Sequence, residues 1–206
     1  IRDRAQAGLT QLALEAILRP GDPVPIISLL KHPLARFGLS SEAFTRASKA
    51  LELIALRGGR VETEVGNLET VLDTQLLAQR EDRHPPAWRL ALPDGSVDAA
   101  RDLARRIAMA TEPLRSAFVR RDRSGRAFTD RLPLSDWAER TGRVMEAICG
   151  DENTDLAALW SGEAGDKLSS LFAELMESGD ILDADGPQWI DIFAALVAGE
   201  SIKPRS

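Results

Sequence analysis

The sequence predicts an all-α domain of irregular architecture, with about eight or nine helices. Apolar residues recur at helical spacing in one segment after another, and no segment alternates convincingly with the period of two expected for a strand. Aromatic residues make up only 5% of the chain, and tyrosine is absent. The core must therefore consist mainly of leucine, alanine, isoleucine and valine, which favours helices packed on helices.

The first helix of the segment 25–58 is predicted to be short and buried, because residues 26–30 are apolar almost all round. Asp22 can cap this helix, and Pro23 suits its first position, where no amide hydrogen is needed. Pro33 disfavours the α conformation at His32, so the helix is expected to end there. The sequence thus predicts a rigid corner directly after a short helix.

A longer helix is predicted to follow this corner. Gly38 marks a turn, and Ser40 or Ser41 can cap the helix. Its apolar face consists of Phe44, Ala47, Leu51, Ile54 and Ala55, and Arg57-Gly58-Gly59 is expected to close it.

The other helices are predicted from the same spacing of apolar residues and from caps and breakers at their ends. They cover roughly 2–19, 67–76, 96–110, 133–148, 163–178 and 187–197. Pro113 is expected to start a further segment with Thr111 as its cap, and Asn153 to cap a short turn that runs to Trp160. Prolines and an Asp94-Gly95 pair predict a loop over 81–95, where a subdivision near 82–95 is possible. We otherwise expect a single helical domain over 1–206, with an exposed, mobile, arginine-rich loop from Arg120 to Arg131.

Composition and charge exclude several classes of protein. A hydrophobic content of 44% with 28% charged residues is typical of a globular protein and not of a disordered chain. The net charge of −6 is unevenly spread: residues 101–131 hold nine basic and four acidic side chains, whereas residues 150–206 hold three and twelve. A general nucleic-acid-binding protein usually has a strongly positive domain, so the composition does not favour one.

Location is constrained by the single cysteine and by hydropathy. Cys149 cannot form an internal disulfide and is compatible with a reducing, cytoplasmic compartment. No apolar run is long enough for a membrane helix, and no signal-peptide pattern occurs. The chain begins at Ile1 inside a helical pattern, so we expect it to be a fragment of a longer polypeptide.

No residues form a recognisable catalytic, cofactor-binding or metal-binding motif. His32 and His84 each precede a proline and have no partner at ligand spacing, and Cys149 has no nearby histidine. Neither phosphate-binding glycine motif is present, and the segment 160–165 lacks the glycine-serine-glycine order of a nucleophile elbow. Ser161 is more simply interpreted as a helix cap.

Charged clusters offer two further candidates. The acidic pairs Asp151-Glu152 and Asp183/Asp185 flank predicted helix ends, which favours interaction with helix dipoles over metal binding. The arginine-rich segment is a solvated loop in the simpler interpretation, but mobile arginines also bind phosphate backbones. Candidate nucleic-acid-binding residues are therefore Arg120, Arg121, Arg123 and Arg126.

Two blocks of sequence resemble a known family. Residues 29–39, LLKHPLARFGL, and 50–58, ALELIALRG, resemble the AddB subunit of bacterial AddAB helicase-nucleases, particularly the alphaproteobacterial type. The segments 159–165, LWSGEAG, 190–199 and 203–205 agree in the expected order, whereas residues 60–150 match only as a helical region. The resemblance implies an internal fragment, similar to the helical insertion of a superfamily 1 helicase-like domain.

The resemblance also implies what the parent protein does. The parent subunit would belong to an ATP-dependent helicase and exonuclease that processes DNA double-strand breaks for homologous recombination. Its partners would be the AddA-type subunit and DNA, and its cofactors an iron-sulfur cluster and magnesium, with ATP bound in the complex. None of the family's catalytic, nucleotide-binding or cluster-binding motifs lies in this segment, so no catalytic residue is carried over to it.

Two other functions remain open. A free-standing helical interaction module would use the acidic C-terminal third to bind a basic partner. An uncharacterised hydrolase would need a nucleophile and a base converging in a pocket, and the sequence indicates neither.

Overall fold

The computed structural model of the chain describes residues 5–57, 63–81, 92–121, 127–178 and 182–200. The fold is mostly helical, with 71% helix and eight helices of seven or more residues in the described part, and the predicted helical class is confirmed. The elements are α1 (Ala5–Leu18), α2 (Pro23–Leu30), α3 (Ser41–Leu51), the π-helical turn η2 (Glu52–Leu56), α4 (Leu68–Glu81), α6 (Ser96–Ala110), α7 (Glu112–Arg115), β1 (Phe118–Arg121), β2 (Ala127–Thr129), β3 (Leu132–Pro133), α8 (Leu134–Cys149), α9 (Ala157–Trp160), α10 (Gly162–Glu177), β4 (Asp183–Ala184) and α11 (Gly186–Glu200).

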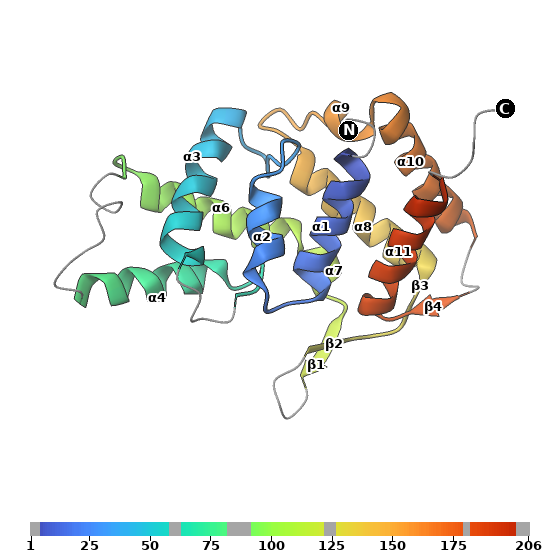
Figure 1. Cartoon of the computed structure of the whole chain (residues 1–206), viewed down its shortest axis with the longest axis horizontal. Coiled ribbons are helices and arrows are strands. Elements are labelled where there is room, and N and C mark those ends of the chain that lie inside the picture. Colours follow the sequence, from blue (N-terminus) through green and yellow to red (C-terminus); the bar gives the residue numbers. More distant parts are fainter. Residues whose placement is uncertain (1–4, 58–62, 82–91, 122–126, 179–181, 201–206) are drawn as a thin grey trace.

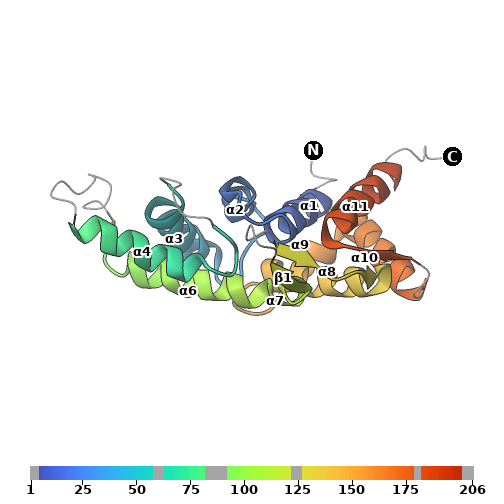
Figure 2. The ribbon, with the colours of Figure 1, turned by 90° about the horizontal axis from the view of Figure 1, so that it is seen from below.

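The helices form an elongated body of two layers (Figures 1 and 2). One layer holds α3, α2, α1 and α11, and the other holds α4, α6, α7, α8 and α10. Helix α3 packs along α6, α10 packs on α8, and α1 packs between α2 and α11. A continuous hydrophobic core fills the space between the layers.

The corner after α2 connects the two layers. As predicted, Asp22 caps α2 by accepting a hydrogen bond from the amide of Val24 at 2.9 Å. The helix ends at Leu30, two residues before the predicted end at His32. The amides of Arg36 and Phe37 then donate to the carbonyl of Ile148 at 2.8 and 2.9 Å, at the end of α8. These bonds use carbonyls that the last turn of α8 leaves without a helical partner.

The backbone of the corner is held in an uncommon conformation. Phe37 and Gly38 have φ angles of +52° and +73°, and the amide of Gly38 donates to the carbonyl of Gly150 at 2.7 Å. Arg106 of α6 donates from Nη1 to the carbonyls of both Phe37 and Gly38 at 3.3 Å. The C-terminal end of α8 and helix α6 therefore both hold the corner in place.

Helix α3 begins where the sequence predicts. Ser40 accepts a hydrogen bond from the amide of Ala43 at 3.2 Å, and the predicted apolar face from Phe44 to Ala55 is buried. The helix continues directly into the π-helical turn η2, which the residue spacing did not predict.

Helix α11 starts at a reciprocal cap between Asp185 and Gln188. The Asp185 carboxylate accepts from the amide of Gln188 at 2.8 Å, and the Gln188 side chain accepts from the amide of Asp185 at 3.1 Å. This arrangement is a capping box, and it confirms the predicted role of Asp185 at a helix end.

The predictions for the hairpin segment and for α2 are wrong. The segment from Arg120 to Arg131 is not simply a loop, because β1 and β2 pair as an antiparallel hairpin. Helix α2 is not buried on all sides, because it lies in an outer layer and Val24 is 61% exposed. The second two-stranded pair, β3 with β4, is only two residues long on each strand, so sheet content is low, as expected.

The loop predicted over 81–95 falls mostly on residues 82–91, which lie outside the described residues. Within the described ranges, every helix is too short or too polar to cross a lipid bilayer.

Candidate nucleic-acid interface

The predicted arginine site belongs to a hairpin that projects from the body (Figure 1). Arg120 and Arg121 lie in β1, whereas Arg123 and Arg126 lie outside the described residues. The base of the hairpin is fixed, because the amide of Gly186 donates to Thr129 Oγ1 at 2.6 Å and the amide of Asp130 donates to the carbonyl of Ala117 at 2.9 Å. Two of the four arginines thus lie on β1, whose partner strand β2 is anchored to α11.

The histidine predicted to be a corner residue has that role. His32 Nδ1 accepts a hydrogen bond from the amide of Leu34 at 3.3 Å, and partial burial lowers the pKa of the imidazole, which favours its neutral form. His84 lies outside the described residues.

Cys149 is a packing residue in the last turn of α8. Its side chain is buried, and burial raises the pKa of the thiol to about 12. A thiol with this pKa is protonated at neutral pH and is therefore a poor nucleophile and a poor metal ligand.

The acidic residues after α8 shape a turn. The Asp151 carboxylate accepts hydrogen bonds from the amides of Asn153 and Asp155 at 2.8 and 3.0 Å, and these bonds lower the pKa of Asp151. Asp155 in turn accepts from the amide of Ala157 at the start of α9, a position that was predicted for Asn153. Over the described ranges, no three histidine, cysteine or acidic side chains come close enough to share a metal ion.

The segment 160–165 is also structural. Gly162 has a φ angle of +76°, and a Cβ atom added at Gly165 would lie 2.5 Å from the carbonyl carbon of Trp160. These two glycines therefore allow α10 to start in close contact with the end of α9. Ser161 occupies the N-cap position, but its side chain makes no capping hydrogen bond.

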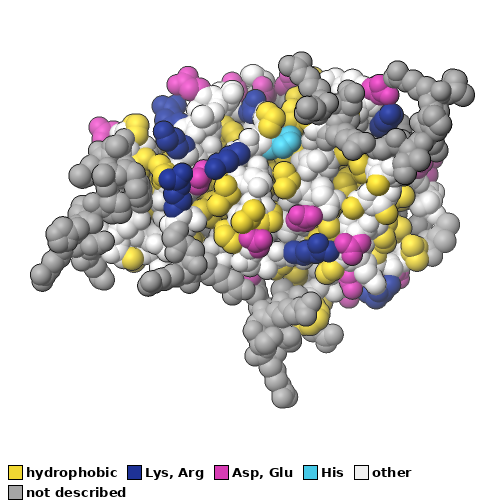
Figure 3. Space-filling model, in the orientation of Figure 1, with side chains coloured by type: hydrophobic (Ala, Val, Ile, Leu, Met, Phe, Trp, Pro, Cys, Tyr) yellow, Lys and Arg dark blue, Asp and Glu magenta, His cyan; other side chains and the backbone are white. Residues whose placement is uncertain are grey.

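A cationic surface that was not predicted lies on α3 and at the ends of α2 and η2. We call it the basic face, and it consists of Lys31, Arg46, Lys49 and Arg57. All four residues are exposed, and Figure 3 shows lysine and arginine side chains gathered over α3 and toward α2. The opposite side of α3 is buried against α6, so these cations stand on a firmly packed helix.

One carboxylate connects two members of the basic face. Glu52 Oε1 lies 3.1 Å from Lys31 Nζ and 3.4 Å from Arg57 Nη2. The Glu52 side chain is only 16% exposed, whereas the side chains of Lys31 and Arg57 are 59% and 63% exposed. The two cations therefore converge on a single oxygen atom at the protein surface.

The other two members, Arg46 and Lys49, have no hydrogen bond or ion pair within the described part of the chain. Every other cationic side chain that the structure describes has such a partner. Most pair with a carboxylate, for example Arg105 with Glu69 at 2.7 Å and Arg143 with Glu139 at 2.6 Å. Arg46 and Lys49 are therefore available to an external anion.

Counting charged residues over a shorter window of the sequence would have revealed the basic face. Residues 31–57 contain five basic and two acidic side chains, but residues 1–100 together are almost neutral. Arg46 and Lys49 are also three positions apart on the polar side of a predicted helix, which places them on one face.

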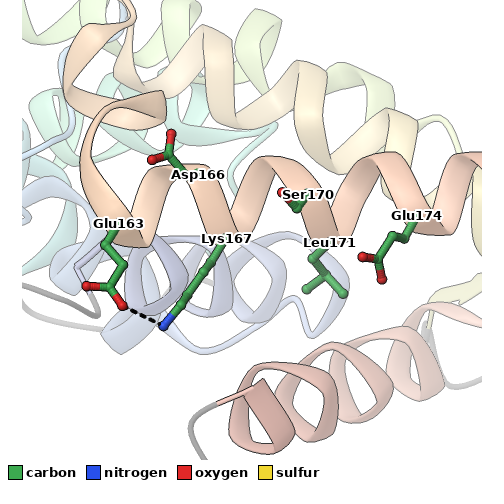
Figure 4. Close-up of a pocket in the computed structure, with 6 residues that line it drawn as sticks. All are labelled: Glu163, Asp166, Lys167, Ser170, Leu171 and Glu174. Carbon is green, nitrogen blue, oxygen red and sulfur yellow. Dashed lines mark ion pairs between the residues drawn. The ribbon is translucent and has the colours of Figure 1, made fainter. Parts of the chain in front are cut away.

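A shallow groove on α10 is the main feature of the acidic third of the chain. Its volume is about 470 Å³, and its lining residues come from one side of the helix, namely Glu163, Asp166, Lys167, Ser170, Leu171 and Glu174. Figure 4 shows Glu163 and Lys167 turned toward each other, and their charged atoms are 3.0 Å apart. With one lysine against three carboxylates, the groove is suited to a cationic group.

Comparison with known proteins gave no match: no family model, no curated protein and no solved structure matches this chain significantly.

Proposed function

We propose that the chain is a non-catalytic helical domain in a subunit of an ATP-dependent helicase-nuclease that processes DNA double-strand breaks for homologous recombination. The domain would resemble the helical insertion of a superfamily 1 helicase-like domain in an AddB-type subunit. Its role is to position DNA or neighbouring domains of the parent subunit and the AddA-type partner.

The observation that carries this proposal is the geometry of the corner at 33–38. This segment contains the residues that resemble the family, and its amides bond to carbonyls at the end of α8 at 2.7 to 2.9 Å. A joint fixed to both layers suits a domain whose role is geometric, because binding surfaces on it keep a constant relative position. One of these surfaces is the basic face, directly beside the corner.

The cofactors of the parent complex would be bound elsewhere in it. An iron-sulfur cluster requires cysteine thiolates, and the buried, protonated thiol of Cys149 does not suit that task. Magnesium and ATP would likewise be held by other parts of the complex.

Binding of the 206-residue chain to a labelled DNA duplex tests the proposal. We expect weak binding that falls steeply as the salt concentration rises, because phosphate contacts release counterions. Charge reversal at Arg120, Arg121, Arg123 and Arg126 in the intact complex tests the hairpin separately. Unchanged DNA affinity in that variant would remove the hairpin from the DNA-binding surface.

The groove on α10 favours a second function, a helical interaction module that binds a basic partner. Its three carboxylates are exposed, and Leu171 adds a half-buried apolar side chain. A lysine-rich peptide that bound the chain when duplex DNA did not would support this alternative over the first.

A further inference from the structure

We infer that the basic face is the surface through which this domain binds the phosphate backbone of duplex DNA. The inference rests on the proposed function and identifies a site for it on α2, α3 and η2.

The first argument is the availability of charge. Arg46 and Lys49 stand one helical turn apart on the exposed side of α3 and have no partner within the described residues. On α6, α8 and α10, by contrast, the exposed cations Arg105, Arg143 and Lys167 each pair with a neighbouring carboxylate. Arg46 and Lys49 are therefore the exposed cations of the described residues that no protein group engages.

The second argument is the arrangement around Glu52. Its Oε1 atom accepts from Lys31 Nζ at 3.1 Å and from Arg57 Nη2 at 3.4 Å, so both donors already point to one anionic oxygen. A phosphate oxygen is the same kind of acceptor, and one phosphate beside Glu52 can receive bonds from both cations. Glu52 holds the pair in position and also weakens the local attraction for an anion.

The third argument concerns the kind of nucleic acid. The members of the basic face are lysines and arginines, which contact phosphates. The aromatic residues of 31–57, Phe37 and Phe44, are buried, so no unpaired base can stack on them. Their helices are packed on the core, so they form a rigid surface. Such a surface suits the regular phosphate backbone of a duplex, and phosphate contacts bind DNA without sequence preference.

Fluorescence anisotropy with a labelled duplex tests the inference on the double variant Arg46→Glu/Lys49→Glu. If four phosphates are contacted, the affinity of the wild-type chain should fall about 150-fold between about 50 and 200 mM salt, and that of the variant only about tenfold. At the lower salt concentration the variant should also bind at least about tenfold more weakly.

The matched control is Arg143→Glu/Lys167→Glu. These residues are exposed on α8 and α10, and their reversal changes the net charge by the same amount. The control should retain the salt dependence of the wild-type chain. Circular dichroism verifies that each variant is folded.

Glu52→Gln tests the convergent pair. The substitution keeps an acceptor between Lys31 and Arg57 but removes the negative charge, so DNA should bind about threefold more tightly. Glu139→Gln is the control, because it removes an exposed carboxylate from α8 and should change affinity much less.

The outcomes separate the site from the function. If the wild-type chain binds DNA and the two double variants behave alike, the basic face is excluded while the proposed role in DNA binding stands. If the folded wild-type chain does not bind DNA at low salt, both the inference and the DNA-positioning role are overturned.

Discussion

At the scale of single residues, a buried chain of hydrogen bonds fixes α8 to α11. Trp189 Nε1 donates to Thr141 Oγ1 at 3.1 Å, and Thr141 Oγ1 donates to the carbonyl of Trp137 at 2.6 Å. Trp137 Nε1 in turn donates to the carbonyl of Ala184 at 2.8 Å. Both tryptophans are fully buried, so neither indole can turn to water for another partner.

Thr141→Val should therefore destabilise the protein. The substitution leaves the buried Nε1 of Trp189 without an acceptor, and we expect the free energy of unfolding to fall by about 1 to 3 kcal/mol. Thr74→Val is the control, because Thr74 also bonds to the carbonyl four residues earlier but is exposed. Urea unfolding followed by circular dichroism measures both, and an equal loss in the two variants would contradict the role of Thr141.

The burial of Cys149 makes stability depend on pH in the alkaline range. Burial raises the pKa of the thiol from 9.0 to about 12, so above about pH 9 the unfolded chain loses this proton while the folded chain keeps it. The free energy of unfolding should fall with rising pH by up to about 1.4 kcal/mol per unit from this group.

Cys149→Ala provides the comparison for this pH dependence. Its unfolding free energy should fall less steeply than that of the wild-type chain above about pH 9, with parallel curves below about pH 8. The chain contains no tyrosine, so no phenol titrates in this window. The free energy of unfolding is measured by urea unfolding at each pH. If it fell equally steeply with pH in both proteins above about pH 9, the thiol would not be held in its neutral form in the folded chain.

At the scale of elements, the helices were predictable because local chemistry defines them. The caps of Asp22 and Ser40, the breaker Pro33 and the apolar spacing of α3 all lie within a few residues of the structures they determine. The capping box of α11 is equally local. Such features depend little on the rest of the fold.

The hairpin was not predicted because the sequence pattern that indicates it covers only a few residues. Phe118 and Val119 lie before the Ser124-Gly125 pair, and Phe128 and Thr129 lie after it, which is a hairpin pattern of only a few residues. Strands of four and three residues gain much of their stability from tertiary contacts, here the bond between Thr129 and Gly186. A charge count over the segment does not contain that information.

In the basic face, too, the features set by nearby residues were predictable from the sequence, and those set by tertiary packing were not. Arg46 and Lys49 could be placed together from helical spacing alone. The convergence of Lys31 and Arg57 on Glu52 could not, because it depends on how α2 packs beside η2. A single sequence gives no independent indication of that packing.

At the scale of the whole molecule, the corner after α2 determines whether the two layers behave as one unit. The carbonyls of Ile148 and Gly150 accept the amides of Arg36, Phe37 and Gly38, and Arg106 holds the other side of the same segment. None of these bonds can break without separating the corner from α8 or α6. We therefore expect the corner to open in the same event in which the layers separate.

Hydrogen exchange tests this coupling. The amides of Phe37 and Gly38 should exchange within about tenfold of the rate of Val144 and Met145 in the buried part of α8, because all of them open in the same event. Within the described residues, the amide of Leu34 donates only to His32 Nδ1, at 3.3 Å, and should exchange at least about a hundredfold faster. Fast exchange at Phe37 and Gly38 with α8 still protected would mean that the corner is a hinge. Surfaces on either side of the corner would then move independently. Such motion would contradict the proposal that the domain positions its partners.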